Sequence, residues 1–242
     1  MTSITKITLA CLALLATSGV FAQKAGDNVV NLGLALIHPN TQLASVTTTS
    51  TSAASATAFT ASLKDATAHV DSHTFASFSW LHMYSNNMGA EVTIGIPKEF
   101  TLDLTTPNGT VKNHDGAVKL KILTPAVVAK YFFGTTQDQW RPYLGLGVSH
   151  VAFSGVRVNA ADSTVQALAG TTAESSSSWT PIYNAGLIYN LDDTWSVSGA
   201  VSYLPIKTAV TFVGPGLGVP ITSTADVKLN STSYVLRVGY RF

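Results

Sequence analysis

Histidine is the residue type in this chain that could most directly supply metal or acid–base chemistry. Only His69 and His73 lie close together, with Asp71 between them, so these three side chains could form a metal site in a loop. The surrounding segment is rich in Ser and Thr and adds no supporting acid, which favours a solvated loop without metal. The other histidines are scattered: His38, His82, His114 and His150.

Serine and histidine are both plentiful, but no spacing sets a nucleophile beside a base, so we assign no catalytic residue. The glycine runs at 145–147 and 214–218 are not followed by a predicted helix, as a phosphate-binding loop requires. The sequence therefore predicts neither an enzyme nor a cofactor.

Five charged side chains lie in segments that are otherwise small or apolar. They are Glu91, Lys130, Arg141, Arg237 and Arg241. Glu91 is the only acid of the five, and a buried charge without a partner is strongly unfavourable. We predict that Glu91 bridges Lys130 or an arginine and that this charge cluster fills the inner half of a narrow lumen. A polar core with a purely structural role explains these residues equally well.

The elements that must position these charges are β-strands. Strand-like alternation occurs in eight segments, at about 27–38, 72–84, 88–97, 119–133, 140–153, 179–190, 194–206 and 231–242. The gaps between them alternate strictly between long and short. The long gaps are 39–71, 98–118, 154–178 and 207–230, and the short ones are 85–87, 134–139 and 191–193. Tight turns at one end and long loops at the other are typical of an up-and-down barrel in an outer membrane.

The even number of strands places both termini on the side of the short turns, which is the periplasmic side in such a barrel. The first long loop is of low complexity, because Thr, Ser and Ala make up 18 of its 22 residues between Thr41 and Ser62. We expect this loop to be mobile and solvated.

The two faces of the strands differ in a way that suits lipid outside and a crowded interior inside. Side chains alternate between faces along a strand. The last strand sets Tyr234, Leu236, Val238, Tyr240 and Phe242 against Ser233, Val235, Arg237, Gly239 and Arg241. The small column fits the interior of a narrow barrel, whereas a soluble barrel would present many Lys and Glu to water.

Aromatic residues gather beside the short turns, all on the apolar face. They are Tyr84, Tyr131, Phe133, Trp140, Tyr189, Trp195, Tyr240 and Phe242. Rings at one level on the outer face form the membrane girdle of an outer membrane barrel. The alternative is a set of aromatics at the edge of a soluble core. The sequence predicts an all-β fold: an eight-stranded antiparallel transmembrane β-barrel in contact with outer membrane lipid.

The composition limits the function classes. The chain has 242 residues, 46% hydrophobic and 11% charged, with a formal net charge of +1. A disordered chain would be less apolar and more charged, and no basic excess is present to bind nucleic acid.

Residues 1–22 have the pattern of a cleaved signal peptide, with Lys6 before an apolar run and Val20-Phe21-Ala22 before the cut. The mature chain, 23–242, would then lack Cys11, the only cysteine, and could form no disulfide.

Four segments resemble the outer membrane protein W (OmpW) family of small eight-stranded barrels from Gram-negative bacteria. They are the fourth strand around 123–134, the Arg141-Pro142-Tyr143-x-Gly145-x-Gly147 run, the hairpin from Trp179 through Trp195 to 208, and the terminal Gly239-Tyr240-Arg241-Phe242. The resemblance implies a narrow lumen that takes small hydrophobic molecules from outside and releases them through the barrel wall. It also implies that the assembly machinery reads Phe242.

The family's lumen is narrowed by an apolar pair. Its Trp aligns with Trp179, whereas its Leu falls at Thr93, so this chain departs from the family at the constriction. Above the charges, the inward column itself becomes apolar and predicts a pocket that includes Leu81, Val151, Phe153 and Ile182.

The function expected from these features is a passive outer membrane channel for small hydrophobic molecules. One alternative is a structural or adhesive surface barrel with a sealed lumen. A second alternative is a lipid-modifying enzyme, which would need a Ser and a His within hydrogen-bond reach above the membrane.

Overall fold

The computed structural model describes residues 22–50, 52–62, 66–106, 112–159, 161, 162, 165, 172–216 and 219–242. Nearly all of the predicted signal peptide, Cys11 included, lies outside these residues. No helix in the described part of the chain is long and apolar enough to cross a membrane.

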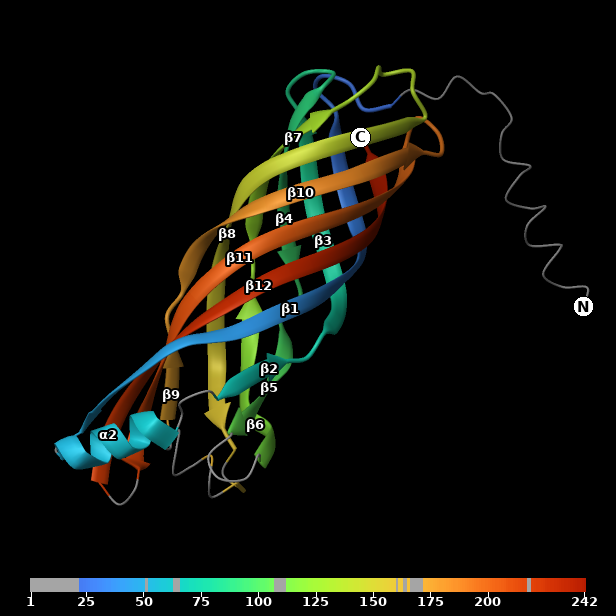
Figure 1. Cartoon of the computed structure of the whole chain (residues 1–242). Helices are drawn as coiled ribbons and strands as arrows, with labels where there is room; N and C mark the ends of the chain where they lie inside the picture. Colours follow the sequence, from blue (N-terminus) through green and yellow to red (C-terminus); the bar gives the residue numbers. More distant parts are fainter. Residues whose placement is uncertain are drawn as a thin grey trace, which may run out of the picture.

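Eight strands pair in a closed antiparallel ring (Figure 1). In pairing order they are β1 (Asn28–Ser50), β3 (His73–Met83), β4 (Met88–Gly95), β7 (Ala126–Phe132), β8 (Trp140–Val158), β10 (Ser178–Asn190), β11 (Trp195–Gly216) and β12 (Val219–Arg241). The ring closes because β12 pairs with β1 along nearly its whole length. The predicted eight-stranded antiparallel barrel is therefore confirmed.

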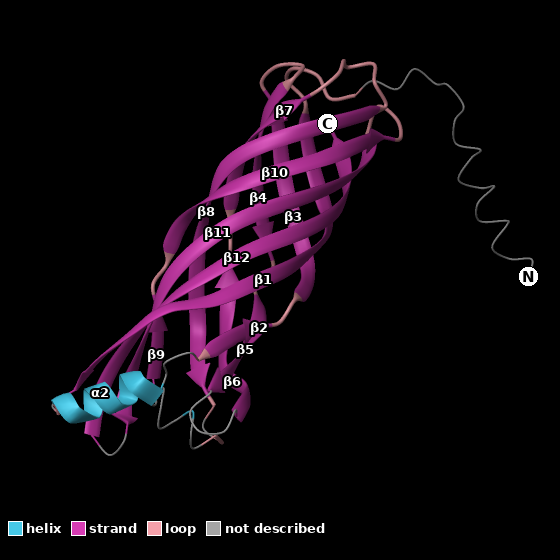
Figure 2. Cartoon of the chain, viewed as in Figure 1, coloured by secondary structure: helices cyan, strands magenta, loops and turns pink. Residues whose placement is uncertain are grey.

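The ring has a short-turn end and a long-strand end (Figure 2). The short-turn end carries the turns 84–87, 133–139 and 191–194 together with the C-terminus (Figure 1). The long-strand end carries the remaining elements, which are α2 (Ala53–Ser62), β2 (Thr67–Val70), β5 (Lys98–Thr106), β6 (Lys112–Leu123) and β9 (Thr172–Ser175). There β6 pairs with both β5 and the outer part of β8, β2 pairs with β5, and β9 pairs with β11.

Four strands run farther than their predicted bounds. β1 continues to Ser50, β8 to Val158 and β11 to Gly216, and β12 already starts at Val219. The first long gap also holds the helix α2, and 98–118 holds most of the β5–β6 hairpin. The Thr- and Ser-rich composition indicated loops, but Thr is β-branched, and the β1–β12 register continues out to Ser50 opposite Ile221.

The predicted fourth strand is split in two at Thr124-Pro125, between β6 and β7. Proline has no N–H to give to a ladder, so a strand is interrupted where it occurs. Both pieces still pair with β8, and the Pro125 carbonyl accepts hydrogen bonds from the Ser149 hydroxyl and the His150 N–H. Ile96-Pro97 interrupts the neighbouring strand between β4 and β5 in the same way.

The alternation of faces follows the predicted pattern. In β7 the side chains of Val128 and Lys130 are buried inside, whereas Val127 and Tyr131 are exposed outside. Gly147 of β8 has no room for a larger residue, since an added Cβ would clash with the Val127 carbonyl oxygen of the neighbouring strand. The interior is filled by side chains in layers, and these layers define the candidate site.

Candidate functional site

A buried ion cluster lies across the lumen in its short-turn half. Glu91 of β4 accepts one hydrogen bond from Lys130 Nζ at 2.7 Å and another from Arg237 Nη1 at 2.9 Å. All three side chains are less than a tenth exposed. Arg237 Nη2 also donates to Ser77 and to Thr93. The pairing predicted for Glu91 is therefore present, and three strands that are distant in sequence are joined at this layer.

Arg141 and Arg241 do not belong to this cluster, contrary to the expectation that all five charges lie together. Arg141 is fully buried and donates to the backbone carbonyls of Gln23 at 2.6 Å and Asn86 at 2.7 Å. Arg241 donates to the Ala22 carbonyl at 2.7 Å and forms an ion pair with Asp27 at 3.2 Å. The alternation of faces placed both arginines inside correctly, but it could not give their height along the barrel.

These two arginines hold residues 22–27 in the short-turn end of the barrel. Gln23 is 2% exposed, and its side-chain amide donates to Asn190 at 2.8 Å. The Gly26 N–H donates to the Met83 carbonyl at 2.8 Å. The N-terminal segment therefore fills this end, below the ion cluster.

An apolar cluster surrounds these polar layers on the same side. It consists of Val29, Leu81, Met83, Phe132, Tyr143 and Ile188. Leu81, which the sequence placed in the upper pocket, belongs to this lower cluster and lies opposite Glu91 in the β3–β4 register. Thr93 likewise binds Arg237 and the Glu91 carboxylate instead of lining an apolar passage.

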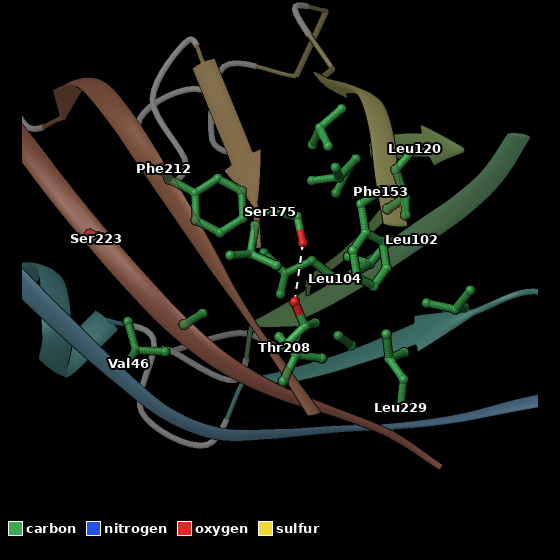
Figure 3. A pocket seen from close by; sticks show the side chains of 18 of the residues that line it. Val46, Leu102, Leu104, Leu120, Phe153, Ser175, Thr208, Phe212, Ser223 and Leu229 are labelled. Atoms are coloured by element: carbon green, nitrogen blue, oxygen red, sulfur yellow. Dashed lines mark hydrogen bonds between the residues drawn. The ribbon is translucent and has the colours of Figure 1, made fainter. Parts of the chain in front are cut away.

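The long-strand half of the lumen is apolar and contains a cavity of about 100 Å³. Its walls come from β1, β2, β5, β6, β8, β9, β11 and β12, and the only polar side chains among the lining residues are Ser175, Thr208 and Ser223. Phe153 and Phe212 extend into it from different strands, and Ser175 and Thr208 hydrogen-bond to each other at 3.3 Å (Figure 3). We call this space the outer cavity.

A packed apolar layer separates the outer cavity from the ion cluster. Val151 and Ile182, two of the residues predicted to line the pocket, belong to this layer with Ile37, Val128 and Leu204. Phe153 packs against it and lines the cavity above. The lumen thus changes from apolar to charged along its length.

Trp179 lies outside the lumen, and this corrects its expected role in a constriction. Its side chain is 72% exposed, and its ring lies 4.8 Å from that of His150 on the outer face. The buried neighbours along β10 are Thr180 and Ile182, so the alternation of that strand excludes an inward Trp179. The expectation came from the family alignment, which the parity of the strand overrides.

The barrel wall is weakly paired beside the outer cavity. The β3–β4 ladder ends at Ser77 opposite Gly95, and the β2–β5 ladder starts only at Val70 opposite Leu102. Between them the Pro97 interruption leaves isolated bonds, such as Lys98 Nζ to the Thr74 carbonyl at 3.2 Å.

A small pocket of about 10 Å³ marks this place. It is lined by Ile37, Phe75, Gly95, Ile96, Lys98, Phe100, Ile122 and Thr124. Ile122 lines both this pocket and the outer cavity, so the two spaces adjoin at this side chain. We call this place the side opening.

The predicted girdle residues lie on the outer face at the short-turn end. Seven of the eight side chains are exposed and Tyr189 is partly so. Neighbouring rings pack against each other. The ring centroids of Trp140 and Tyr189 are 4.4 Å apart, and those of Trp195 and Tyr240 are 5.1 Å apart. Apolar rings in a band outside and a filled interior leave only lipid as a suitable environment for this surface.

A model of the OmpW family matches residues 24–242. The chain belongs to the OmpW family. It is 28% identical over 239 residues to outer membrane protein W of Vibrio cholerae, covering 97% of each chain. It is 25% identical over 178 residues to outer membrane protein AlkL of Ectopseudomonas oleovorans, covering 73% of this chain and 69% of that one.

The fold is shared with solved OmpW-family barrels. The crystal structure of OprG from Pseudomonas aeruginosa superposes with a TM-score of 0.75 at 24% identity, covering 91% of this chain and 98% of OprG. The solution structure of OmpW from Escherichia coli superposes with a TM-score of 0.55 at 19% identity, covering 91% of this chain and 100% of that OmpW chain. Together the sequence and the fold place this chain in the outer membrane of a Gram-negative bacterium.

Sequence reasoning missed much of the wall of the outer cavity in this OmpW-family chain. Phe212, Val227 and Leu229 line it but lie in the range 207–230, which was predicted to be a loop. The signal was available, because Val210-x-Phe212 and Ala225-x-Val227-x-Leu229 alternate with the period of a strand.

No group of three or more His, Cys, Asp or Glu side chains that could hold a metal ion occurs among the described residues. His69 and Asp71 are exposed and 3.8 Å apart. His38 and Ser72 do lie within hydrogen-bond reach, with Nδ1 and Oγ 2.5 Å apart. A buried His114 also bonds Asp162 at 2.7 Å.

Proposed function

We propose that this barrel is a passive channel through which small hydrophobic molecules enter the outer membrane. The observation that carries the proposal is the division of the lumen: the outer cavity is lined almost entirely by apolar side chains, whereas the path beyond it is filled by an ion cluster and by residues 23–27. The free energy of an apolar solute falls in the apolar first half of the lumen. It would rise again among the buried charges of the second half.

The exit in this proposal is the side opening. It adjoins the outer cavity at Ile122, and its backbone has few ladder hydrogen bonds to break. The outer face next to the side opening contacts lipid in this proposal, as the exposed apolar side chains of Val92 and Ile94 indicate. A molecule leaving there passes from one apolar environment to another without crossing water.

A reversible lock on the side opening tests the proposal. Ala76 and Ile96 face each other at its edge, joined by the Ile96 N–H and the Ala76 carbonyl at 3.0 Å, so A76C/I96C can form a cross-strand disulfide. The range 23–242 contains no cysteine, so this pair would be alone in the mature chain.

The variant is expressed in a Gram-negative strain that lacks its own OmpW-family protein, and uptake of the dye N-phenyl-1-naphthylamine is followed by its fluorescence. We expect oxidation to abolish the extra uptake and dithiothreitol to restore it, while the single variants A76C and I96C respond to neither. Uptake that is unchanged by oxidation contradicts the lateral exit. If the unmodified barrel adds no uptake at all, the barrel is a sealed structural or adhesive one.

The Ser72–His38 contact supports lipid modification as a second candidate function, since a hydroxyl within reach of an imidazole is the minimum for acyl transfer. Both residues are exposed, and no acid binds the His38 ring in the described part of the chain. Mass spectrometry of outer membrane lipids from cells carrying Ser72→Ala or the unmodified protein decides this point. Identical lipid profiles exclude the enzyme.

We further propose that the signal peptide is removed after Ala22, that the short-turn end with both termini faces the periplasm, and that the assembly machinery binds the chain through Phe242. The mature chain then begins at Gln23, and Arg241 loses the Ala22 carbonyl but keeps its ion pair with Asp27. The exposed ring of Phe242 and the short turns beside it support this orientation.

A further inference from the structure

Two pairs of cationic side chains lie directly opposite each other on the outer face of the long-strand half. Lys207 of β11 is in register with Lys228 of β12, and Lys119 of β6 is in register with Arg157 of β8. All four side chains are exposed. Like charges in direct cross-strand register destabilise a sheet unless an anion lies between them.

One of the two pairs has its anion within the chain. Glu99 accepts a hydrogen bond from Arg157 Nη2 at 2.7 Å and lies 3.8 Å from Lys119 Nζ. The pair Lys207–Lys228 has no such partner, since neither lysine forms an ion pair with any acid in the described residues. Asp226, the next outward residue on β12, lies opposite Ala209 and has an interaction of its own.

The unneutralised pair is part of a row of donors. Gln42 of β1 is the register partner of Lys228 on its other side and is also exposed, so three strands present Lys207, Lys228 and Gln42 side by side. Two ammonium groups and an amide can neutralise and hydrogen-bond a single group with about two negative charges and several acceptor oxygens. A phosphate monoester, with a charge of about −1.5 to −2 and three acceptor oxygens, has these properties.

The height of this row matches a lipid headgroup. Tyr203, four residues before Lys207 on the same face of β11, is exposed, and its ring stacks on Tyr183 at 6.5 Å. Four residues of strand span about 13 Å, or about 9 Å along the membrane normal at a tilt of about 45°. The backbone of Lys207 therefore lies about 9 Å farther out along the membrane normal than that of Tyr203. The headgroup layer on each side of a bilayer is about 6 Å thick, and a long lysine side chain can bend back to bring its ammonium group into that layer.

We propose that Lys207, Lys228 and Gln42 bind the phosphate monoester of a lipid headgroup in the outer leaflet. This site rests on the orientation proposed above, with the short-turn end in the periplasm, and is independent of transport through the lumen. The bound lipid would supply the anion that Glu99 supplies to the other pair.

The test measures binding of diphosphoryl lipid A to the full barrel in phosphatidylcholine nanodiscs, by native mass spectrometry over a range of lipid A content. We expect K207Q or K228Q to weaken the apparent affinity about five-fold each and the double variant about thirty-fold. K119Q is the matched control, since Glu99 already neutralises its pair, and should change the affinity less than about two-fold.

A third variant separates binding from folding. K207E places opposite charges in register with Lys228, so it should abolish lipid A binding while the thermal midpoint in detergent stays the same or rises. Inorganic phosphate at the concentration of the lipid should not compete. The proposal fails if K207E still binds lipid A, if K119Q weakens binding as much as K207Q, or if inorganic phosphate displaces the lipid.

Discussion

Glu91 and Arg237 are 146 residues apart in sequence, and their side chains meet at 2.9 Å inside the barrel. Lys130 completes the contact from a third strand. The strands that carry them are therefore fixed in both register and height by one buried acid.

Substitution of Glu91 by Gln should lower the free energy of unfolding by about 3–5 kcal/mol, because two buried cations lose their counter-charge. Urea unfolding in detergent micelles measures this change. Arg157→Gln removes one arm of an exposed ion pair with Glu99 and should change stability by less than about 1 kcal/mol. Similar losses in both variants would contradict the assignment of the Glu91 cluster as a buried one.

Arg141 should be needed to keep the short-turn end closed. Arg141→Ala removes the donors to Gln23 and Asn86, so residues 23–27 should detach from the lumen. In planar bilayers we expect little ion conductance for the unmodified protein and a clear rise for this variant. Arg157→Ala is the control on the exposed surface, and unchanged conductance in Arg141→Ala would show that the N-terminal segment is not the seal.

Phe153 and Trp179 should behave oppositely toward a hydrophobic ligand. Phe153→Ala removes apolar surface from the outer cavity and should weaken binding of a small fluorescent probe about tenfold. Trp179→Ala changes the outer face and should leave binding unchanged. Fluorescence titration in detergent measures both. Equal effects of the two substitutions, or none from Phe153→Ala, would argue against the outer cavity as the binding site.

The turn 191–194 should make stability depend on acid pH through Asp192. The backbone N–H groups of Trp195 and Thr194 donate to its carboxylate, each at 2.7 Å, and lower its pKa below the ordinary 3.8. A lowered folded-state pKa means that the unfolded chain binds the proton more tightly. The stabilisation is then complete above pH values near 5 and is lost as the pH falls through the folded pKa.

The variant Asp192→Ala should therefore be less stable than the unmodified protein at neutral pH, by less than about 1 kcal/mol because the group is exposed. The difference should vanish at low pH. Urea midpoints over a pH series measure it, and Asp192→Asn is the comparison, since it keeps an acceptor oxygen but has no group that titrates. A difference that grows toward low pH would contradict this interpretation.

Alternation along the strands was enough to predict the ring and its two faces. It placed Glu91, Lys130 and Arg237 inside and the aromatic girdle outside, because lipid and a narrow lumen select opposite residue types. Alternation predicts which face of the barrel a side chain lies on, but not which residue it contacts. Arg141 and Arg241 point inward as predicted, but they bind the N-terminal segment. Trp179 follows the alternation of β10 and lies outside, which the resemblance to the family does not reveal.

The outer half could not be predicted because its composition is ambiguous. The Thr-, Ser- and Ala-rich segment from Thr41 to Ser62 has no clear strand or helix pattern, and pairing with β12 makes residues up to Ser50 extended, whereas Ala53–Ser62 form α2. The outer cavity depends on that pairing, since Val46 lies opposite Ala225 in one wall only when the strands continue.

The seam of the ring joins the beginning of the chain to its end, with Val29 opposite Arg241. Both β1 and β12 must therefore be synthesised before closure can begin, and until then two long edges with unpaired amides are available to other chains. Such a polypeptide folds slowly because its decisive contacts are the most distant in sequence. It must be kept apart from its neighbours on the way to the membrane, and removing the last strand would leave a curved sheet that cannot close.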